Sequence, residues 1–143
     1  MAIDQRGDHW HGDTFADLVT YVHVYKAAGY AVTDVGEAVC ADCGERSFRL
    51  VADDDEGCVQ RTCTACGAEA FIADSGEFAG DADLWACECP CGGDTFGVAV
   101  GFARGSDNEV RWVSVGLRCL TDGRLGVYAD WKIDYTPTHD LSP

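Results

Sequence analysis

The chain has 143 residues, of which 25 are acidic and 10 are basic, so its formal net charge is −15 at pH 7. Hydrophobic residues make up 47% of it, which is enough for one domain or for two small units with a common core. No apolar run approaches the ~20 residues that a membrane-spanning helix needs, and the polar start lacks a signal-peptide pattern. We therefore expect a cytoplasmic protein without a membrane or direct nucleic-acid partner, because phosphates repel so acidic a chain.

The N-terminal segment, residues 1–37, contains one predicted amphipathic helix from about Thr14 to Ala28. Thr14 and Asp17 have the spacing of a capping box, which satisfies the first free amides of a helix. A stripe of apolar residues follows at helical spacing: Phe15, Leu18, Val19, Val22 and Tyr25. We expect this stripe to pack on the rest of the chain as core.

Nine cysteines follow in groups, which is too many for ordinary core residues. In a reducing compartment they favour metal ligation over disulfides. Cys58 falls within a predicted strand and is expected to be a buried small hydrophobic residue rather than a ligand.

Two Cys-x-x-Cys-Gly turns, at Cys40 to Gly44 and Cys63 to Gly67, are the strongest signal in the sequence. The two-residue spacing lets both sulfurs of a turn face one ion, and the glycine permits a positive φ below them. Between the turns, residues 47–51 and 59–62 alternate polar and apolar as hairpin strands, and residues 69–72 supply a third strand. The predicted site is a tetrathiolate of Cys40, Cys43, Cys63 and Cys66.

These turns and strands resemble the zinc-ribbon (zinc β-ribbon) superfamily, over a first unit that we place at residues 38–75. The resemblance implies a ribbon fold and a bound zinc ion, but little about activity. A closed four-thiolate site leaves no coordination position for a substrate, so a structural metal is expected.

A degenerate second ribbon is predicted at residues 84–136, followed by a tail at 137–143. It repeats the Cys-Gly and Phe positions of the first at Cys91, Gly92 and Phe96. Its expected strands are 96–102, 110–115 and 125–133. The fold class is thus mainly β with one N-terminal α-helix, a small α+β protein of two three-stranded antiparallel zinc ribbons packed together.

The ligands of the second site can be chosen in two ways, because Glu88 takes the place of Cys40 and Asp122 that of Cys66. One set is Cys87, Cys89, Cys91 and Cys119, which we favour because thiolate is the softer zinc ligand. The other set is Cys89, Cys91, Cys119 and Asp122. A third possibility is that this site has lost its metal.

The expected function is that of a non-catalytic zinc-binding interaction module, an adaptor or accessory protein. Its strongly acidic surface suits a protein partner with a basic surface. One alternative is an inhibitor or immunity-type protein that masks a basic nucleic-acid-handling enzyme. Another is a small zinc hydrolase, if the second site keeps an open position at which a water becomes a nucleophile.

Overall fold

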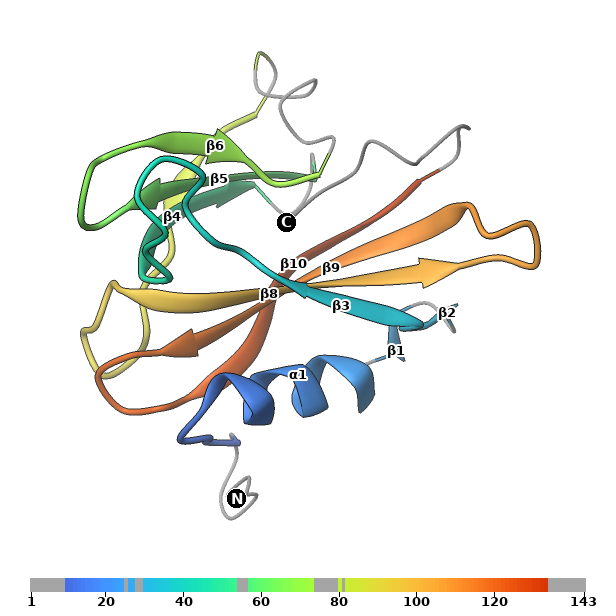
Figure 1. The fold of residues 1–143 in the computed structure, drawn as a ribbon, viewed down its shortest axis with the longest axis horizontal. Helices are drawn as coiled ribbons and strands as arrows, with labels where there is room; N and C mark the ends of the chain where they lie inside the picture. The colour runs from blue at the N-terminus through green and yellow to red at the C-terminus, as the bar shows by residue number, and fades with distance from the viewer. Residues whose placement is uncertain are drawn as a thin grey trace.

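The computed structural model describes residues 10–24, 26–27, 30–53, 57–73, 80 and 82–133, and the predicted tail at 137–143 lies outside this part. The described part is mainly β with a single helix, so the predicted fold class is confirmed. The elements, drawn in Figure 1, are α1 Phe15–Val24, β1 Lys26–Ala27, β2 Tyr30–Ala31, β3 Asp34–Glu37, β4 Phe48–Asp53, β5 Cys58–Cys63, β6 Glu69–Phe71, β7 Trp85–Ala86, β8 Phe96–Arg104, β9 Val110–Cys119 and β10 Leu125–Lys132.

Two antiparallel three-stranded ribbons organise the sheet, one of β4, β5 and β6 and the other of β8, β9 and β10. The ribbons do more than pack together, because β4 and β8 pair antiparallel at Phe48 and Phe96. The strand order is therefore β10-β9-β8-β4-β5-β6, with β3 paired to β8 and β7 paired to β4. Phe48 also pairs with Cys63, and Phe96 with Cys119, so each ribbon brings a cysteine of its hairpin beside this junction.

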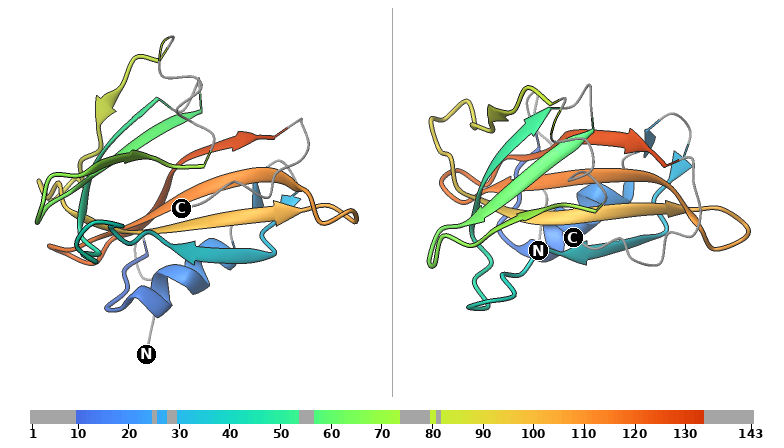
Figure 2. Two further views of the ribbon diagram at one scale, coloured as in Figure 1. Left: turned by 45° about the horizontal axis from the view of Figure 1, so that its top comes forward. Right: turned by 90° about the horizontal axis from the view of Figure 1, so that it is seen from above.

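The second ribbon forms a middle layer that is covered on both faces (Figure 2). Its side chains alternate along β8: Val98, Val100 and Phe102 belong to the large core shared with the first ribbon, whereas Ala99 packs with Leu18 and Val22 of α1. A strand that is buried on both faces has a nearly continuous apolar sequence, which explains the run from Val98 to Ala103.

The helix packs directly on the middle layer where two strands carry glycine, Gly101 and Gly116. A Cβ atom added at Gly101 would be 2.6 Å from Val22 Cγ1, and one at Gly116 would also clash with Val22. Val22 is fully buried. The helix can therefore come this close because Gly101 and Gly116 have no side chains.

The helix begins where the capping pattern predicts, since Thr14 Oγ1 accepts a hydrogen bond from the Asp17 amide at 3.2 Å. The predicted end at Ala28 is wrong: α1 ends at Val24, and Lys26–Ala27 pairs with Tyr30–Ala31 as an antiparallel hairpin. The backbone groups of residues 26–27 thus bond across a hairpin rather than along a helix. No helix in the described ranges has the length and apolarity to cross a membrane.

Candidate metal centres

Four cysteines from two turns meet at the first site, which comprises Cys40, Cys43, Cys63 and Cys66. All four Sγ atoms lie within 4.8 Å of one another, and the Cys40–Cys66 and Cys43–Cys63 pairs are 3.6 and 3.5 Å apart. Four sulfurs at ~2.3 Å from a tetrahedral zinc ion are about 3.8 Å apart, so this arrangement fits zinc closely. Gly44 and Gly67 follow the turns with φ of +78° and +79°, as the Cys-x-x-Cys-Gly pattern predicts.

Backbone amides favour the thiolate form of two of the four cysteines in this site, Cys63 and Cys40, whereas the pKa values of Cys43 and Cys66 are raised beside the other thiols. The amides of Cys66 and Ala65 donate to Cys63 Sγ at 3.5 and 3.4 Å, and these bonds lower the pKa of Cys63 to about 7. The amides of Cys43 and Asp42 likewise lower the pKa of Cys40. Because a metal binds the thiolate and not the thiol, each lowered pKa reduces the free energy lost to deprotonation.

The second site, which we define as Cys89, Cys91, Cys119 and Asp122, again brings four donor atoms within 4.8 Å of one another. Cys91 and Cys119 Sγ are 3.6 Å apart, and both carboxylate oxygens of Asp122 are 3.6 Å from Cys89 Sγ. Of the two ligand sets that the sequence allows, the structure therefore gathers the one that contains Asp122. Three thiolates and a carboxylate are a donor set that zinc accepts, and they complete a tetrahedral site.

Asp122 is positioned as an ionised donor. Desolvation raises its pKa. The Arg124 amide, which donates to Oδ1 at 2.9 Å, and the neighbouring cysteines lower the pKa by more than desolvation raises it, so the net pKa is below the usual value. Burial raises the pKa of Cys89 to about 12, so a metal has to displace a proton from that thiol. The first site contains a comparable thiol, because the pKa of Cys43 is also raised to about 12.

The hydrogen bonds of the turns show which residues correspond in the two sites. The Cys40 amide donates to the Glu45 carbonyl and the Gly44 amide to the Cys40 carbonyl; in the second site Cys89 bonds in the same way with Gly93 and Gly92. Cys89, rather than Glu88, therefore corresponds to Cys40, and the second turn is one residue shorter. Alignment of the Cys-Gly pair at 91–92 with Cys43-Gly44 without a gap puts Glu88 at the position of Cys40, so the sequence comparison missed the one-residue deletion in this turn.

The same comparison holds at the opposite turns. The Gly67 amide donates to the Cys63 carbonyl at 3.0 Å, and the Gly123 amide to the Cys119 carbonyl at 2.8 Å. Gly123 has a φ of +80°, nearly that of Gly67. Asp122 thus stands on the backbone position of Cys66, as the sequence comparison proposes.

Cys87 lies outside both groups of donor atoms. Its amide donates to the Leu50 carbonyl at 2.9 Å, its side chain is 9% exposed, and it belongs to the large core. Burial raises its pKa to about 11, which keeps it a neutral thiol. Cys58 is also fully buried, in agreement with its predicted place in a hairpin strand.

Residues 10–12, which we call the docking segment, lie against the second site, a contact that the sequence does not predict. The Gly12 amide donates to the Gly123 carbonyl and the Leu125 amide to the Trp10 carbonyl, both at 2.8 Å. His11 forms an antiparallel bridge with Arg124 between them. The second site is therefore attached directly to the segment that precedes α1.

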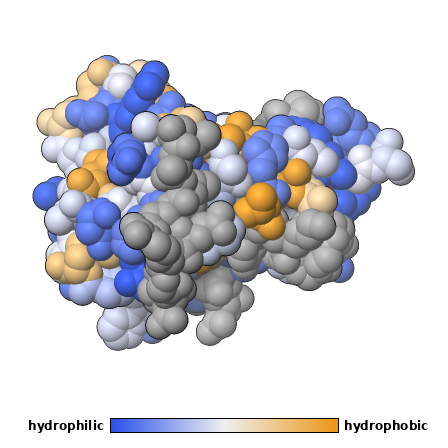
Figure 3. Space-filling model, turned by 90° about the horizontal axis from the view of Figure 1, so that it is seen from below, coloured by the Kyte–Doolittle hydropathy of each residue, from blue (hydrophilic) through white to orange (hydrophobic). Residues whose placement is uncertain are grey.

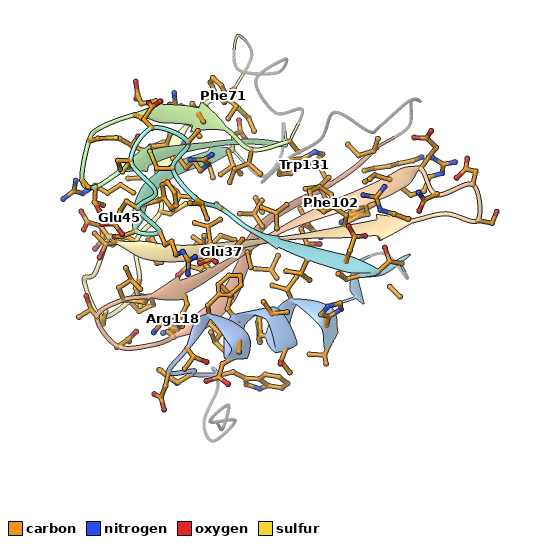
Figure 4. The ribbon with its side chains drawn as sticks, viewed as in Figure 1. Glu37, Glu45, Phe71, Phe102, Arg118 and Trp131 are labelled. Atoms are coloured by element: carbon orange, nitrogen blue, oxygen red, sulfur yellow. The ribbon has the colours of Figure 1, made fainter. Side chains whose placement is uncertain are left out.

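Figure 4 shows Glu37, Glu45 and Arg118 around a recess between the first site and the beginning of α1. The recess has a volume of about 300 Å³, and Phe15 and Leu120 contribute apolar walls. Arg46, also in its lining, is 3.7 Å from Glu37. Because two guanidinium groups offset two carboxylates, this recess is not a strongly charged site.

Comparisons of the chain with protein-family models, with curated proteins and with solved structures find no match. The resemblance to zinc ribbons therefore depends on the two groups of donors and on the ribbons that hold them.

Proposed function

We propose that this chain is a non-catalytic zinc protein whose two metal-bound ribbons present an acidic surface to a protein partner with a basic surface. The observation that carries the non-catalytic part is the completeness of both donor sets: each site brings four donor atoms within 4.8 Å of one another. A zinc ion held by four protein ligands has no position for a substrate or a reactive water. The hydrolase alternative needs an open position, and Asp122, whose carboxylate lies among the three thiols of the second site, would fill it.

The distribution of charge supports an interaction role. Four described arginines pair with carboxylates of the chain itself: Arg46 with Glu37, Arg49 with Asp94, Arg104 with Asp34 and Arg111 with Asp107. With 25 acidic and 10 basic residues, carboxylates still outnumber cations after such pairing. Among the described residues drawn in Figure 3, hydrophilic ones surround small separate patches of hydrophobic ones. A basic partner would be attracted to such a surface and oriented by it.

The proposal retains the cytoplasm as the location, since zinc thiolates persist where disulfides do not form. A basic enzyme that handles nucleic acid is one partner of the required kind, and such an enzyme would make the chain an inhibitor.

The test has two stages on the full chain. Native mass spectrometry first counts bound zinc, and we expect two ions per chain. Immobilised zinc-loaded chain then captures a partner, which is purified and titrated against the chain at several salt concentrations. We expect Kd to rise about ten-fold or more between low and high salt, since screening weakens attraction between opposite charges. A chain with fewer than two zinc ions, or a Kd insensitive to salt, would contradict the proposal.

A further inference from the structure

The two sites stand on equivalent backbone turns but differ in what surrounds them. A Cβ atom added at Gly67 of the first site would meet no atom within 4 Å. One added at Gly123 of the second site would be 2.7 Å from the Gly12 carbonyl oxygen. The turn of the second site is thus covered by the docking segment, and the equivalent glycine of the first has open space beside it.

The residues that contact the docking segment also hold the second site together. The Gly123 carbonyl accepts the Gly12 amide, while the Gly123 amide bonds to the carbonyl of the ligand Cys119. The Arg124 amide orients the Asp122 carboxylate, and Arg124 is bridged to His11. Arg118, next to Cys119, donates to the Gly12 carbonyl at 3.5 Å and lies beside the beginning of α1 (Figure 4). The conformation of residues 118–125 therefore serves both the metal and the docking segment.

The docking segment in turn positions α1. Trp10 packs edge-on against Tyr21 of the helix with ring centroids 5.4 Å apart, and Leu125 packs with Leu18 and Val22. A helix of ten residues is marginal in water without tertiary contacts. Loosening of residues 118–125 would remove both the backbone bonds to the docking segment and the Leu125 contact, so α1 would keep only its packing on β8 and β9.

The second site is also the weaker of the two for zinc. Carboxylate is a harder ligand than thiolate, and Asp122 takes the place of Cys66, which is equally exposed, so the weaker binding follows from the donor atom itself. A recess of about 430 Å³ lies beside this site, lined by Tyr21 of α1 together with Glu88, Pro90 and Arg124. Solvent and small chelators can therefore reach its flank.

We propose that the second site is the exchangeable one of the two, and that its metal controls whether residues 10–24 stay docked on the sheet. A fall in available zinc would empty the second site first and release the docking segment with α1, while the first ribbon keeps its metal and its strands. This inference rests on the proposed function only for the presence of two zinc sites.

The experiment uses the full chain loaded with two zinc ions, to which EDTA is added in steps. Native mass spectrometry counts zinc at each step. Maleimide labelling identifies the emptied site, because Cys91 belongs to the second site whereas Cys43 and Cys66 belong to the first, and all three are exposed. Hydrogen exchange follows the amides of α1 and of β4 and β5. We expect the first zinc to leave with labelling of Cys91 and loss of protection in α1, while β4 and β5 remain protected.

Two reciprocal variants are matched controls. Asp122→Cys gives the second site four thiolates, and we expect the EDTA concentration that removes the first zinc to rise about ten-fold or more. Cys66→Asp places the carboxylate in the first site, and we expect that site to lose zinc at least as early, with protection lost in β4 and β5 before α1 is affected.

Each other outcome has one meaning. If the loaded chain holds two zinc ions but both leave together, or if the second site empties while α1 stays protected, the inference is overturned and the two-zinc protein stands. If the chain never holds two zinc ions, the proposed function itself fails, and this is seen before any EDTA is added.

Discussion

The surroundings of each cysteine distinguish ligands from core residues. Cys87 is buried, hydrogen-bonded through its amide to Leu50 and kept protonated by burial, whereas Cys89 faces the other donors of the second site two residues later. We expect Cys87→Ala to retain two zinc ions and Cys89→Ala to retain one, as counted by native mass spectrometry. Loss of a zinc ion in Cys87→Ala would return this cysteine to the ligand set.

Gly101 is a second residue whose surroundings determine its role. An alanine there would place its Cβ 2.6 Å from Val22, which is fully buried, so we expect Gly101→Ala to lower the free energy of unfolding by ~1–3 kcal/mol. The control is Gly97→Ala in the same strand, where the nearest atom would be 4.0 Å away. Chemical denaturation of the zinc-loaded proteins measures both, and equal effects of the two changes would refute the close approach of α1.

At the scale of elements, α1 depends on its N-terminal cap as well as on packing. Thr14 Oγ1 accepts the Asp17 amide, so we expect Thr14→Ala to destabilise the protein by ~1 kcal/mol. Thr20→Ala is the matched control, because Thr20 is an exposed mid-helix residue whose hydroxyl only donates to the Ala16 carbonyl. We expect that change to be close to neutral. Thermal unfolding followed by circular dichroism compares the two, and a larger loss in Thr20→Ala would argue against the cap.

The two ribbons illustrate how far an element can be predicted from its pattern. Alternation and turn residues indicate the three strands of each ribbon, and the Cys-x-x-Cys-Gly spacing predicts the first site, because both are local properties of the chain. The short strands β3 and β7 escape prediction. They exist because β3 pairs with β8 and β7 pairs with β4, and neither partner is a neighbour in the sequence.

Such contacts are far apart along the chain: Asp34 pairs with Phe102, and Val51 pairs with Ala86.

For the whole molecule, the excess of negative charge is expected to oppose compaction. The formal net charge is −15, and an exposed ion pair such as Arg49–Asp94 contributes little to stability. We therefore expect the Tm of the zinc-loaded protein to rise by a few degrees between about 10 mM and about 500 mM NaCl, because salt screens the repulsion between carboxylates.

The control for this prediction repeats the melts with excess zinc, so that metal loss does not contribute to the shift. A Tm that falls with salt would mean that attractive pairs outweigh the repulsion, and it would weaken the case for an acidic surface that is free to attract a partner.

The sequence by itself determined the fold class, the grouping of four cysteines at the first site and the start of α1, because each follows from residues close together in the chain: a strand pattern, a pair of turns, a cap. It also placed Asp122 among the candidate ligands of the second site.

Only the tertiary structure decided between Asp122 and Cys87, joined the ribbons at Phe48 and Phe96, and brought residues 10–12 to the turn of the second site. The physical reason is that Cys87 and Cys89 lie two residues apart with the same chemistry, and their difference comes from the direction in which the folded backbone points them. Burial in the common core keeps the Cys87 thiol away from the second group of donors, and the short turn at Gly92 brings the Cys89 thiol into it.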